Sequence, residues 1–475
     1  MGCAHSPRAQ EGGTLLLPKY FLLSILGLCS SLEFALKSVQ AEPIAPPASA
    51  PDVQRARKKD LKEGLVNPSG DSLSVGNGTL GSLLGIPKDS PLQIGGFWMG
   101  NGTSQLQGGL NKSSTFAQVA IYELRLNLEK ARLLRGSELW VQGLQMNASN
   151  PNTNAVAGSF QEINNLVGAP PYNRTELYTY GIKQNFLDRQ LQVSIGKVYP
   201  GFYFGSVSRP IPTGKPGETP APNTYLLMNA PYAGPTFLGP EPSLPDSTLG
   251  GVINLQPNYF RKRVYLTVGL FDGRNGTGAT AIPTGLRPPS FSGPKLLMAE
   301  AGGVWSASSK QLPGLLSLGL WHQGGTITSP CPDGAIGCLS QNGATGFYGY
   351  AVQRLAEFGK ADSQGRVTAF LLGGYTGATT YLATSSVSGG INVDGLFKRR
   401  PLDSYGFGWS WAKLNDNPSA NWGLNSNELM FQAYARWHAG FDVYVQPALS
   451  YLPIVGFSNT KAPSLAFTLQ LLTRF

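Results

Sequence analysis

The chain has 475 residues, of which 60 are glycine, 36 are proline and only 13% are charged, and this composition indicates short extended segments joined by turns rather than a helical protein. The net charge of +10 is scattered along the chain, so it does not indicate the clustered basic surface of a nucleic-acid-binding protein. Beyond residue 40 no uninterrupted apolar run reaches the roughly 20 residues that a membrane-spanning helix needs, so any crossing of a membrane must be made by strands.

The first 41 residues have the organisation of an export signal. Lys19 precedes an apolar core over residues 20–28, and residues 39–41 place small side chains where a signal peptidase reads them. An N-terminal anchor helix is the alternative, but the apolar core is short and Glu33 interrupts its flank. We predict a signal peptide over residues 1–41. The chain has 37 basic and 27 acidic residues, and removal of the signal peptide takes away three basic and two acidic ones. The mature chain keeps 34 basic and 25 acidic residues, a net charge of +9.

Residues 42–85 are predicted to form a flexible periplasmic tail. The stretch begins rich in proline and alanine and continues with a basic run at Arg55, Arg57, Lys58, Lys59 and Lys62. Such a composition buries too little apolar surface to form a core. We therefore assign the folded domain to residues 86–475.

From about residue 90 onward, apolar residues recur at every second position in short segments. Successive side chains of a strand point to opposite faces, so each such segment has one apolar and one polar face. Glycine, asparagine, aspartate or proline bounds each segment, as residues 272–276 illustrate, and this is a turn signal. The clearest alternating segments are residues 123–129, 191–195, 264–270, 316–320 and 405–411.

Alternation would also suit a soluble β-sandwich or a secreted β-helix, but three features favour an outer-membrane barrel. The polar faces carry Gly, Ser, Thr, Gln, Arg and Glu, which indicates a hydrated interior. The chain ends in an alternating strand whose last residue, Phe475, resembles the signal that the outer-membrane assembly machinery reads. Aromatic residues crowd the segment ends, as expected for girdles at the lipid headgroups: Trp140, Tyr178, Tyr180, Tyr259, Phe260, Trp321, Tyr348, Tyr350, Trp409 and Trp437.

The length sets the number of strands. About 385 residues follow residue 90, and a strand of about 10 residues with its turn or loop uses roughly 20 to 25. We predict an all-β fold, a transmembrane antiparallel β-barrel of about 16 and at most 18 strands, which is wide enough for a water-filled lumen. The proline- and glycine-rich insertions at residues 205–248 and 276–295 are expected to be extracellular or in-folded constriction loops.

Two of the cysteines, Cys331 and Cys338, lie close together with proline and glycine between them. In the oxidising compartment that an export signal implies, they are predicted to form a disulfide. A zinc site is the alternative, but two further ligands are missing nearby. The sequence predicts no metal site and no cofactor.

From about residue 80 onward the order of several segments resembles the carbohydrate-selective porin (OprB) family. The resemblance implies a 16-stranded barrel that admits monosaccharides and similar polyols. Two departures stand out: the family's Gly-Asp-Trp-Gly-Gly-Leu-Arg segment is absent near residues 81–85, and its Pro-Gly-Arg is replaced over residues 397–401. The matching stretches are residues 172–178, 184–191, Gly269-Leu-Phe271-Asp272-Gly273, Gly319-Leu-Trp321-His-Gln323, residues 346–353, 403–408, Asn427-Glu428 with Tyr434, residues 445–451, and Phe475.

A neutral sugar offers a channel no charge, so selection must come from hydrogen bonds, ring stacking and pore width. Arginine and glutamate supply donors and acceptors that match neighbouring hydroxyl groups. For each such residue the alternative is a solvated charge with no part in selection. Tryptophans 321 and 409 are assigned to the girdles instead of to sugar stacking. The predicted pore-lining residues are Glu123, Arg125, Arg174, Glu176, Lys398, Arg399 and Arg400.

The predicted function is passive diffusion of small carbohydrates through the bacterial outer membrane into the periplasm. A general non-selective porin and a plugged structural or adhesive barrel are the alternatives. An enzyme is not expected, because the mature chain has only two histidines, His322 and His438, and neither lies in a recognisable nucleophile motif. The expected partners are small sugars, outer-membrane lipid and the barrel assembly machinery, with no nucleic acid, and the protein is expected to be a monomer or a trimer.

Overall fold

The structure is a computed structural model. The predicted signal peptide, most of the tail, Cys331 and most of the insertions at 205–248 and 276–295 lie outside the residues that it describes. The described residues are 79–87, 89–151, 153–164, 166, 172–205, 247–260, 264–274, 290–305, 312–329, 338–358, 365–417, 425–440, 442–457 and 462–475.

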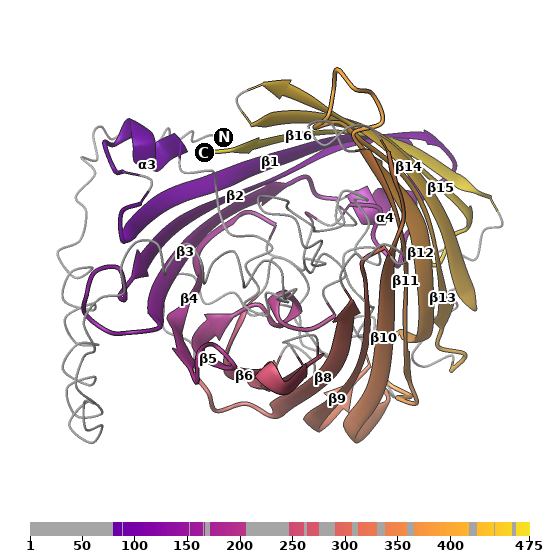
Figure 1. The fold of residues 1–475 in the computed structure, drawn as a ribbon. Coiled ribbons are helices and arrows are strands. Elements are labelled where there is room, and N and C mark those ends of the chain that lie inside the picture. The colour runs from indigo at the N-terminus through magenta and orange to yellow at the C-terminus, as the bar shows by residue number, and fades with distance from the viewer. Residues whose placement is uncertain are drawn as a thin grey trace, which may run out of the picture. The chain divides into compact units, whose positions relative to one another are not determined.

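Within these residues, sixteen antiparallel strands close into a barrel (Figure 1). Each strand pairs with its neighbours in the sequence, and β1 pairs with β16 to complete the ring. Closure leaves no strand edge unpaired, which matters in hydrocarbon because no water is present to bond exposed backbone groups. The predicted fold class is confirmed, with the lower of the two strand numbers.

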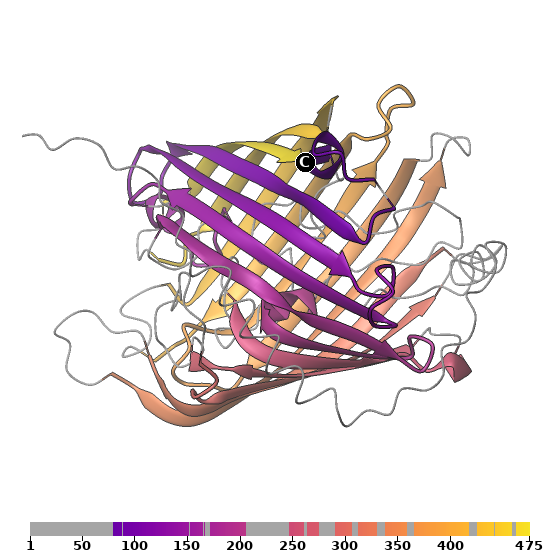
Figure 2. The same cartoon turned by 90° about the vertical axis from the view of Figure 1, so that its left-hand side faces the viewer.

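The strands run obliquely around the barrel, as Figure 2 shows, and their lengths range from 8 to 19 residues. They are β1 (Leu92–Gln107), β2 (Ser114–Asn127), β3 (Ser137–Ala148), β4 (Arg174–Phe186), β5 (Leu191–Val198), β6 (Thr248–Leu255), β7 (Val264–Asp272), β8 (Lys295–Trp305), β9 (Gly314–Thr328), β10 (Ser340–Phe358), β11 (Gly365–Thr376), β12 (Ala383–Asp394), β13 (Ser404–Leu414), β14 (Asn427–Gly440), β15 (Val443–Ile454) and β16 (Ser464–Arg474).

The helical elements in the described part of the chain are short. They are the α-helices α3 (Thr79–Leu83) and α4 (Thr153–Ala157) and the 3-10 helices η2 (Pro200–Phe202) and η4 (Asn258–Phe260). Among the described residues, no helix combines the length and the hydropathy needed to cross a bilayer.

The two-residue alternation separates the outer from the inner face of the wall. On β9 the leucines at 316, 318 and 320 are 51%, 66% and 61% exposed. Ser317 and Gln323, which point to the opposite face of the same strand, are fully buried. The same alternation holds on β7, where Leu266, Val268 and Leu270 are exposed. Exposed apolar side chains on the outside and polar ones inside are the arrangement of a barrel that faces hydrocarbon outside and water inside.

The connections between strands differ at the two ends of the barrel. At one end they are all short, the longest being residues 128–136 and 395–403. At the other end residues 149–173, 199–247 and 273–294 form long connections. Outer-membrane barrels place short turns in the periplasm and long loops outside the cell. We therefore call these the short-turn end and the long-loop end, and assign the first to the periplasm.

Phe475 completes the closure of the barrel at the short-turn end. Its backbone N–H and C=O pair with those of Gly96 on β1, both at 2.9 Å. Its ring lies over Gly96, where a Cβ would be only 2.3 Å from the ring, and 5.9 Å from the ring of Tyr122. The terminal aromatic thus packs on the outer face, which is the face that a membrane-bound receptor would meet. Its role as an assembly signal stays a prediction.

The assignment of the strand-end aromatics to lipid girdles is wrong for several of them. Trp321, Tyr348 and Tyr350 are at most 2% exposed and share the inner face with Ser317. Trp321 fits there because Gly346 faces it from β10, and a Cβ at Gly346 would lie 2.3 Å from the indole. Trp140 and Tyr178 also belong to the inner face, whereas Tyr180, Trp409 and Trp437 lie on the outer one.

Candidate functional site: the lumen and its in-folded segments

The connection between β3 and β4 turns into the barrel, and we call residues 153–164 the first in-folded segment. Its helix α4 lies inside the ring of strands against β1, β2 and β16 (Figure 1). Gly158 ends α4 with a φ of +71°, a left-handed conformation that favours glycine. Asn101 Nδ2 on β1 donates to Asn164 Oδ1 at 2.7 Å, and the hydroxyls of Thr115 and Thr153 are 2.7 Å apart. These bonds fix the segment to the β1–β2 wall.

The buried carboxylate of Glu428, on the inner face of β14, holds the other side of this segment. Its Oε1 accepts hydrogen bonds from Ser159 Oγ and from the backbone N–H of Gln161, both at 2.9 Å. Its Oε2 accepts from the N–H groups of Phe160 at 2.8 Å and Gly456 at 2.7 Å. Because Gly456 belongs to the connection between β15 and β16, one carboxylate joins two connections of the long-loop end to the wall.

The start of the β5–β6 connection also turns inward, and we call residues 199–205 the second in-folded segment. Aromatic rings hold it to β4 and β7. The ring of Phe202, in η2, meets those of Tyr178 and Tyr199 edge-on at 6.5 and 5.0 Å. Phe204 packs edge-on against Phe271 of β7 at 6.0 Å. The two in-folded segments therefore occupy lumen space along different walls of the barrel.

A second buried carboxylate, Glu300 on β8, binds the end of this segment by a hydrogen bond. The N–H of Gly205 donates to Glu300 Oε2 at 2.6 Å. Three tyrosine hydroxyls of the wall bond the same carboxylate: Tyr265 at 2.7 Å, Tyr348 at 2.8 Å and Tyr350 at 2.9 Å. Hydrogen bonds to an ionised group are stronger than neutral ones, so both glutamates are effective anchors for the in-folded backbone.

A ladder of charged side chains lines the inner face of β2, β3 and β4 toward the short-turn end. Arg125 Nε pairs with Glu123 Oε1 at 2.7 Å, and its Nη1 pairs with Glu138 Oε1 at 3.1 Å. Lys183 Nζ reaches the same Glu138 oxygen at 3.2 Å. Gln142 Nε2 donates to Glu123 Oε2 at 2.6 Å. The structure thus brings the predicted residues Glu123 and Arg125 together and extends them into a row of alternating charge, which we call the charged ladder.

An indole stands directly beside the charged ladder. Trp140 Nε1 donates to Thr179 Oγ1 at 3.2 Å, and this hydroxyl donates to Gln142 Oε1 at 2.6 Å. Trp140 packs against Gly181, where a Cβ would lie 2.7 Å from the indole. The indole N–H is therefore satisfied by the wall, and the ring is held at a fixed angle next to the charges.

Arg174 and Glu176, also predicted, lie nearer the long-loop end of β4. Arg174 Nε and Glu176 Oε1 are 3.4 Å apart, and Lys197 Nζ is 3.4 Å from Glu176 Oε2. Lys197 also donates to the carbonyl of Leu177 at 2.7 Å. All three charged side chains are almost fully buried. This group is a compact, internally paired cluster, in contrast to the more accessible charged ladder.

The remaining predicted residues, Lys398, Arg399 and Arg400, lie in the turn between β12 and β13 and not on a strand wall. All three are exposed. Arg400 Nη2 donates to Asp403 Oδ1 at 3.1 Å, and the hydrogen bond to this aspartate and its negative charge raise the pKa of the guanidinium. The structure does not bring this group together with the charged ladder.

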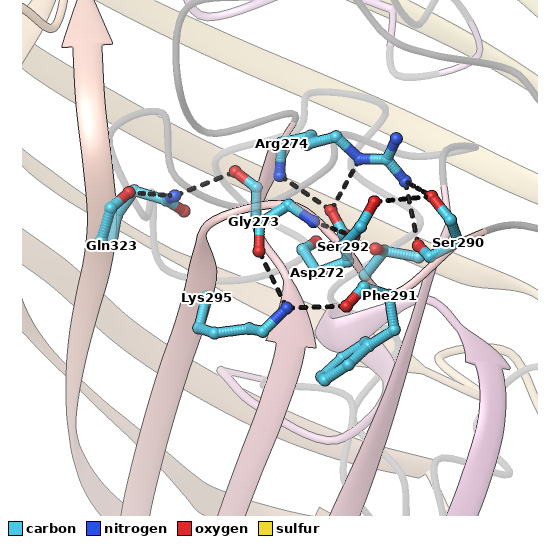
Figure 3. Close-up of polar contacts among 11 residues, drawn as sticks. Asp272, Gly273, Arg274, Ser290, Phe291, Ser292, Lys295 and Gln323 are labelled. Atoms are coloured by element: carbon cyan, nitrogen blue, oxygen red, sulfur yellow. Dashed lines mark hydrogen bonds and ion pairs between the residues drawn. The ribbon is translucent and has the colours of Figure 1, made fainter.

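Figure 3 shows the neck of the β7–β8 insertion, which is one of the connections at the long-loop end. Asp272 Oδ1 accepts from Arg274 Nε at 2.9 Å, and Asp272 Oδ2 accepts from the N–H of Gly293 at 3.0 Å. Lys295 Nζ donates to the carbonyl of Phe291 at 2.9 Å and lies 3.9 Å from the centre of its ring. The conformations of both ends of the insertion are therefore fixed by one aspartate and its neighbours.

The sequence alone did not single out either anchoring glutamate. Glu428 appeared only within a matching stretch, and Glu300 is the one acid of β8, at an inward position of a strand that is apolar apart from Glu300 and Lys295. Glu138 and Lys183 were missed as well, although both alternate with outward apolar residues, Leu139 and Ile182. Strand parity could have found the ladder residues. Cys338 is in a disulfide, but the other predicted half, Cys331, lies outside the described residues, so their pairing stays a prediction.

Comparisons with known proteins agree with this architecture. The family model described as carbohydrate-selective porin, OprB family, matches residues 111–475. A high-pH structure of Pseudomonas putida OprB is similar at 18% identity with a TM-score of 0.67, covering 84% of this chain and 96% of its own. A low-pH structure of that protein is 15% identical with a TM-score of 0.49, covering 84% of this chain and 96% of its own. Salmonella typhi OmpF in complex with daunomycin is 9% identical with a TM-score of 0.48, covering 82% of this chain and 99% of its own. No curated protein matches the sequence.

Proposed function

Because the chain belongs to the carbohydrate-selective porin (OprB) family, we propose that its selectivity resides where the charged ladder and Trp140 face the space left by the two in-folded segments. The protein is a porin of the bacterial outer membrane that passes small carbohydrates into the periplasm, and the family resemblance of its sequence is confirmed. The solutes proposed here are neutral monosaccharides and polyols.

The chemistry of the ladder suits a neutral, hydroxyl-rich solute. A sugar hydroxyl both donates and accepts, and it exchanges its water partners for wall partners as it passes. Glu123 and Glu138 supply acceptors, and Arg125 and Lys183 supply donors, in alternation along one wall. Since each charge has an opposite charge within 3.2 Å, the wall offers strong hydrogen-bonding groups without a net attraction for ions.

Trp140 adds a flat apolar surface to that wall. The apolar face of a pyranose packs on an aromatic ring, while its hydroxyls point to the ring's polar neighbours. The bond from its Nε1 to Thr179 fixes the indole beside the ladder. The observation that carries the proposal is this juxtaposition of a fixed indole with paired donors and acceptors on one face.

Conductance of single channels in planar bilayers, with glucose or sucrose titrated in, tests the proposal. We expect sugars to reduce the ion current of the wild type, and Arg125→Gln or Trp140→Ala to weaken this block more than they change the current without sugar. Lys112→Gln, in the exposed β1–β2 connection, is the matched control. Current without sugar block would indicate a general pore, and absence of current a plugged barrel. Either result contradicts the proposal.

The processing and partners of the chain form a separate part of the proposal. Residues 1–41 act as a cleaved signal, residues 42–85 as a periplasmic tail and residues 86–475 as the barrel, with lipid and the assembly machinery as partners. The family is one of transport channels, and we extend this to an absence of enzymatic activity. N-terminal sequencing of the outer-membrane form checks the cleavage: a mature chain that begins before residue 42 contradicts it.

A further inference from the structure

The two ends of the barrel carry different charge. By sequence, the seven connections at the short-turn end contain twelve Lys or Arg residues and five Asp or Glu residues, a net charge of +7. The eight connections at the long-loop end contain six of each and are neutral overall. Among the residues that the structure describes, the short-turn connections contain seven bases and four acids, and the long-loop connections contain two of each. An excess of positive charge therefore lies at the rim assigned to the periplasm.

Exposed apolar side chains accompany these bases. In the β2–β3 turn Leu133 is 72% exposed and lies between Arg132 and Arg135 in the sequence. In the β12–β13 turn Phe397 is 53% exposed and directly precedes Lys398 and Arg399. Large exposed apolar residues in a soluble turn are unfavourable, but beside bases they match the boundary between headgroups and acyl chains.

The β12–β13 turn lies against the outer face of the wall. The ring of Phe397 meets that of Tyr405 edge-on at 5.9 Å. Tyr405 alternates on β13 with inward-facing Ser404 and shares the outer face with Phe407. The basic tip therefore stands at the edge of the apolar outer surface and not over the lumen.

Three acidic residues of this rim are engaged within the protein. Asp403 bonds Arg400 and the N–H of His438, and Asp442 bonds Arg474 at 3.0 Å. Glu129 Oε2 accepts from the N–H of a neighbouring glycine at 3.2 Å. The partners of these three acids lie in the turns themselves or at the adjoining strand ends, and none of the contacts involves the exposed bases Arg132, Arg135, Lys398 and Arg399.

From this arrangement we propose that the short-turn rim is a docking surface for anionic phospholipid in the periplasmic leaflet of the outer membrane, with Arg132, Arg135, Lys398 and Arg399 contacting the phosphate groups. Basic side chains near a bilayer surface are attracted to anionic headgroups, and long side chains reach the headgroup level while their stems stay in apolar surroundings. The side chains of Leu133 and Phe397 then enter the acyl-chain region next to the headgroups of the same leaflet.

The test measures lipid retained by the purified full chain from mixed micelles that contain equal amounts of phosphatidylglycerol and phosphatidylcholine. We expect the wild type to retain phosphatidylglycerol preferentially and the preference to weaken with salt. The double variant Lys398→Gln/Arg399→Gln should lower the apparent affinity for phosphatidylglycerol roughly thirtyfold, because each base near the surface contributes about 1 kcal/mol and about 1.4 kcal/mol is a factor of ten. Addition of Arg132→Gln and Arg135→Gln should lower it further.

The matched control is Lys112→Gln/Lys413→Gln, which removes two exposed bases at the long-loop end. All variants must keep the heat-modifiable mobility of a folded barrel. The proposal is overturned if the wild type retains both lipids equally, or if the control loses as much affinity as the rim variant. Binding of polyglutamate at the rim without any lipid preference would indicate an acidic protein partner and would also overturn it.

Discussion

The two in-folded segments are held by buried glutamates in opposite ways. At Glu428 the wall supplies only the carboxylate, and the donors are three backbone N–H groups and one serine hydroxyl from the connections. At Glu300 the wall supplies the carboxylate and three of its four donors, the tyrosine hydroxyls, and the connection supplies one N–H. The first acid orders the connections, whereas the second acid mainly orders the wall around it.

This difference predicts which anchor sets the width of the lumen. A backbone N–H cannot rotate to another acceptor when its own is removed, whereas a tyrosine hydroxyl can. At Glu300 such partners are already near: the hydroxyls of Tyr265 and Tyr350 are 3.1 Å apart. We infer that the first in-folded segment depends on its glutamate more strongly than the second depends on Glu300.

The largest effect is expected for Glu428→Ala. Three backbone N–H groups lose their acceptor, at a cost of about 1–3 kcal/mol each where water does not replace it. The first in-folded segment should leave the wall, so that single-channel current rises, fluctuates more and is blocked less by sugar. For Glu428→Gln, which keeps one acceptor oxygen, the current and its block by sugar should be intermediate between those of Glu428→Ala and the wild type. An unchanged current in Glu428→Ala would show that the segment is held by its bonds to β1 and β2.

A smaller effect on the current is expected for Glu300→Ala. The second in-folded segment loses one N–H acceptor, but its rings still pack on Tyr178 and Phe271. The wall loses the centre of its tyrosine cluster, so thermal unfolding in detergent should show a loss of about 2 kcal/mol. If the current rises more than in Glu428→Ala, the proposed contrast between the two anchors is incorrect.

Tyr348→Phe tests whether a single wall hydroxyl on Glu300 contributes to stability without affecting the lumen. It removes one of three hydroxyl donors to Glu300 and leaves the ring in place. We expect a loss of stability of about 1.5 kcal/mol, since a hydrogen bond to a charged group contributes about 1.5–3 kcal/mol, and no change in current. The melting temperature and the single-channel current of the same preparation give both readouts, and an altered current would assign the hydroxyl a role in the lumen.

The smallest effect is expected for Ser159→Ala. The change removes one side-chain donor and leaves the three backbone N–H groups on Glu428. The remaining donors keep the segment in place, so the noise of the open channel should rise only slightly, with a cost of about 1 kcal/mol. An effect as large as that of Glu428→Ala would mean that the hydroxyl, and not the backbone, orders the segment.

The sequence predicted the strands of the wall well because the alternation within each strand is enough to identify its outward and inward faces. The leucines at 316, 318 and 320 mark the outer face without knowledge of any partner strand. The same parity places Trp321 on the inner face, one residue after an outward leucine, so its assignment to a girdle failed because position along the strand was given more weight than parity.

The anchors could not be predicted in this way. Glu428 is 267 and 268 residues from two of the three backbone N–H groups that it binds, and backbone N–H groups leave no trace in the sequence. The basic residues 398–400 look like part of a polar strand face, but they lie in the turn that follows β12. Contacts formed by connections depend on tertiary packing, whereas periodicity reports only local exposure.

The neck at Asp272 has a practical consequence for engineering of the barrel. Strand pairing of β7 with β8 ends at Asp272 and Lys295, and the N–H of Gly273 then donates to the carbonyl of Pro294 at 2.7 Å. Strand pairing is therefore complete before the rest of the insertion begins, and the entropic cost of closing a longer loop rises only slowly with its length. We therefore expect that foreign peptides exchanged for residues 276–288 leave the register of the supporting strands unchanged.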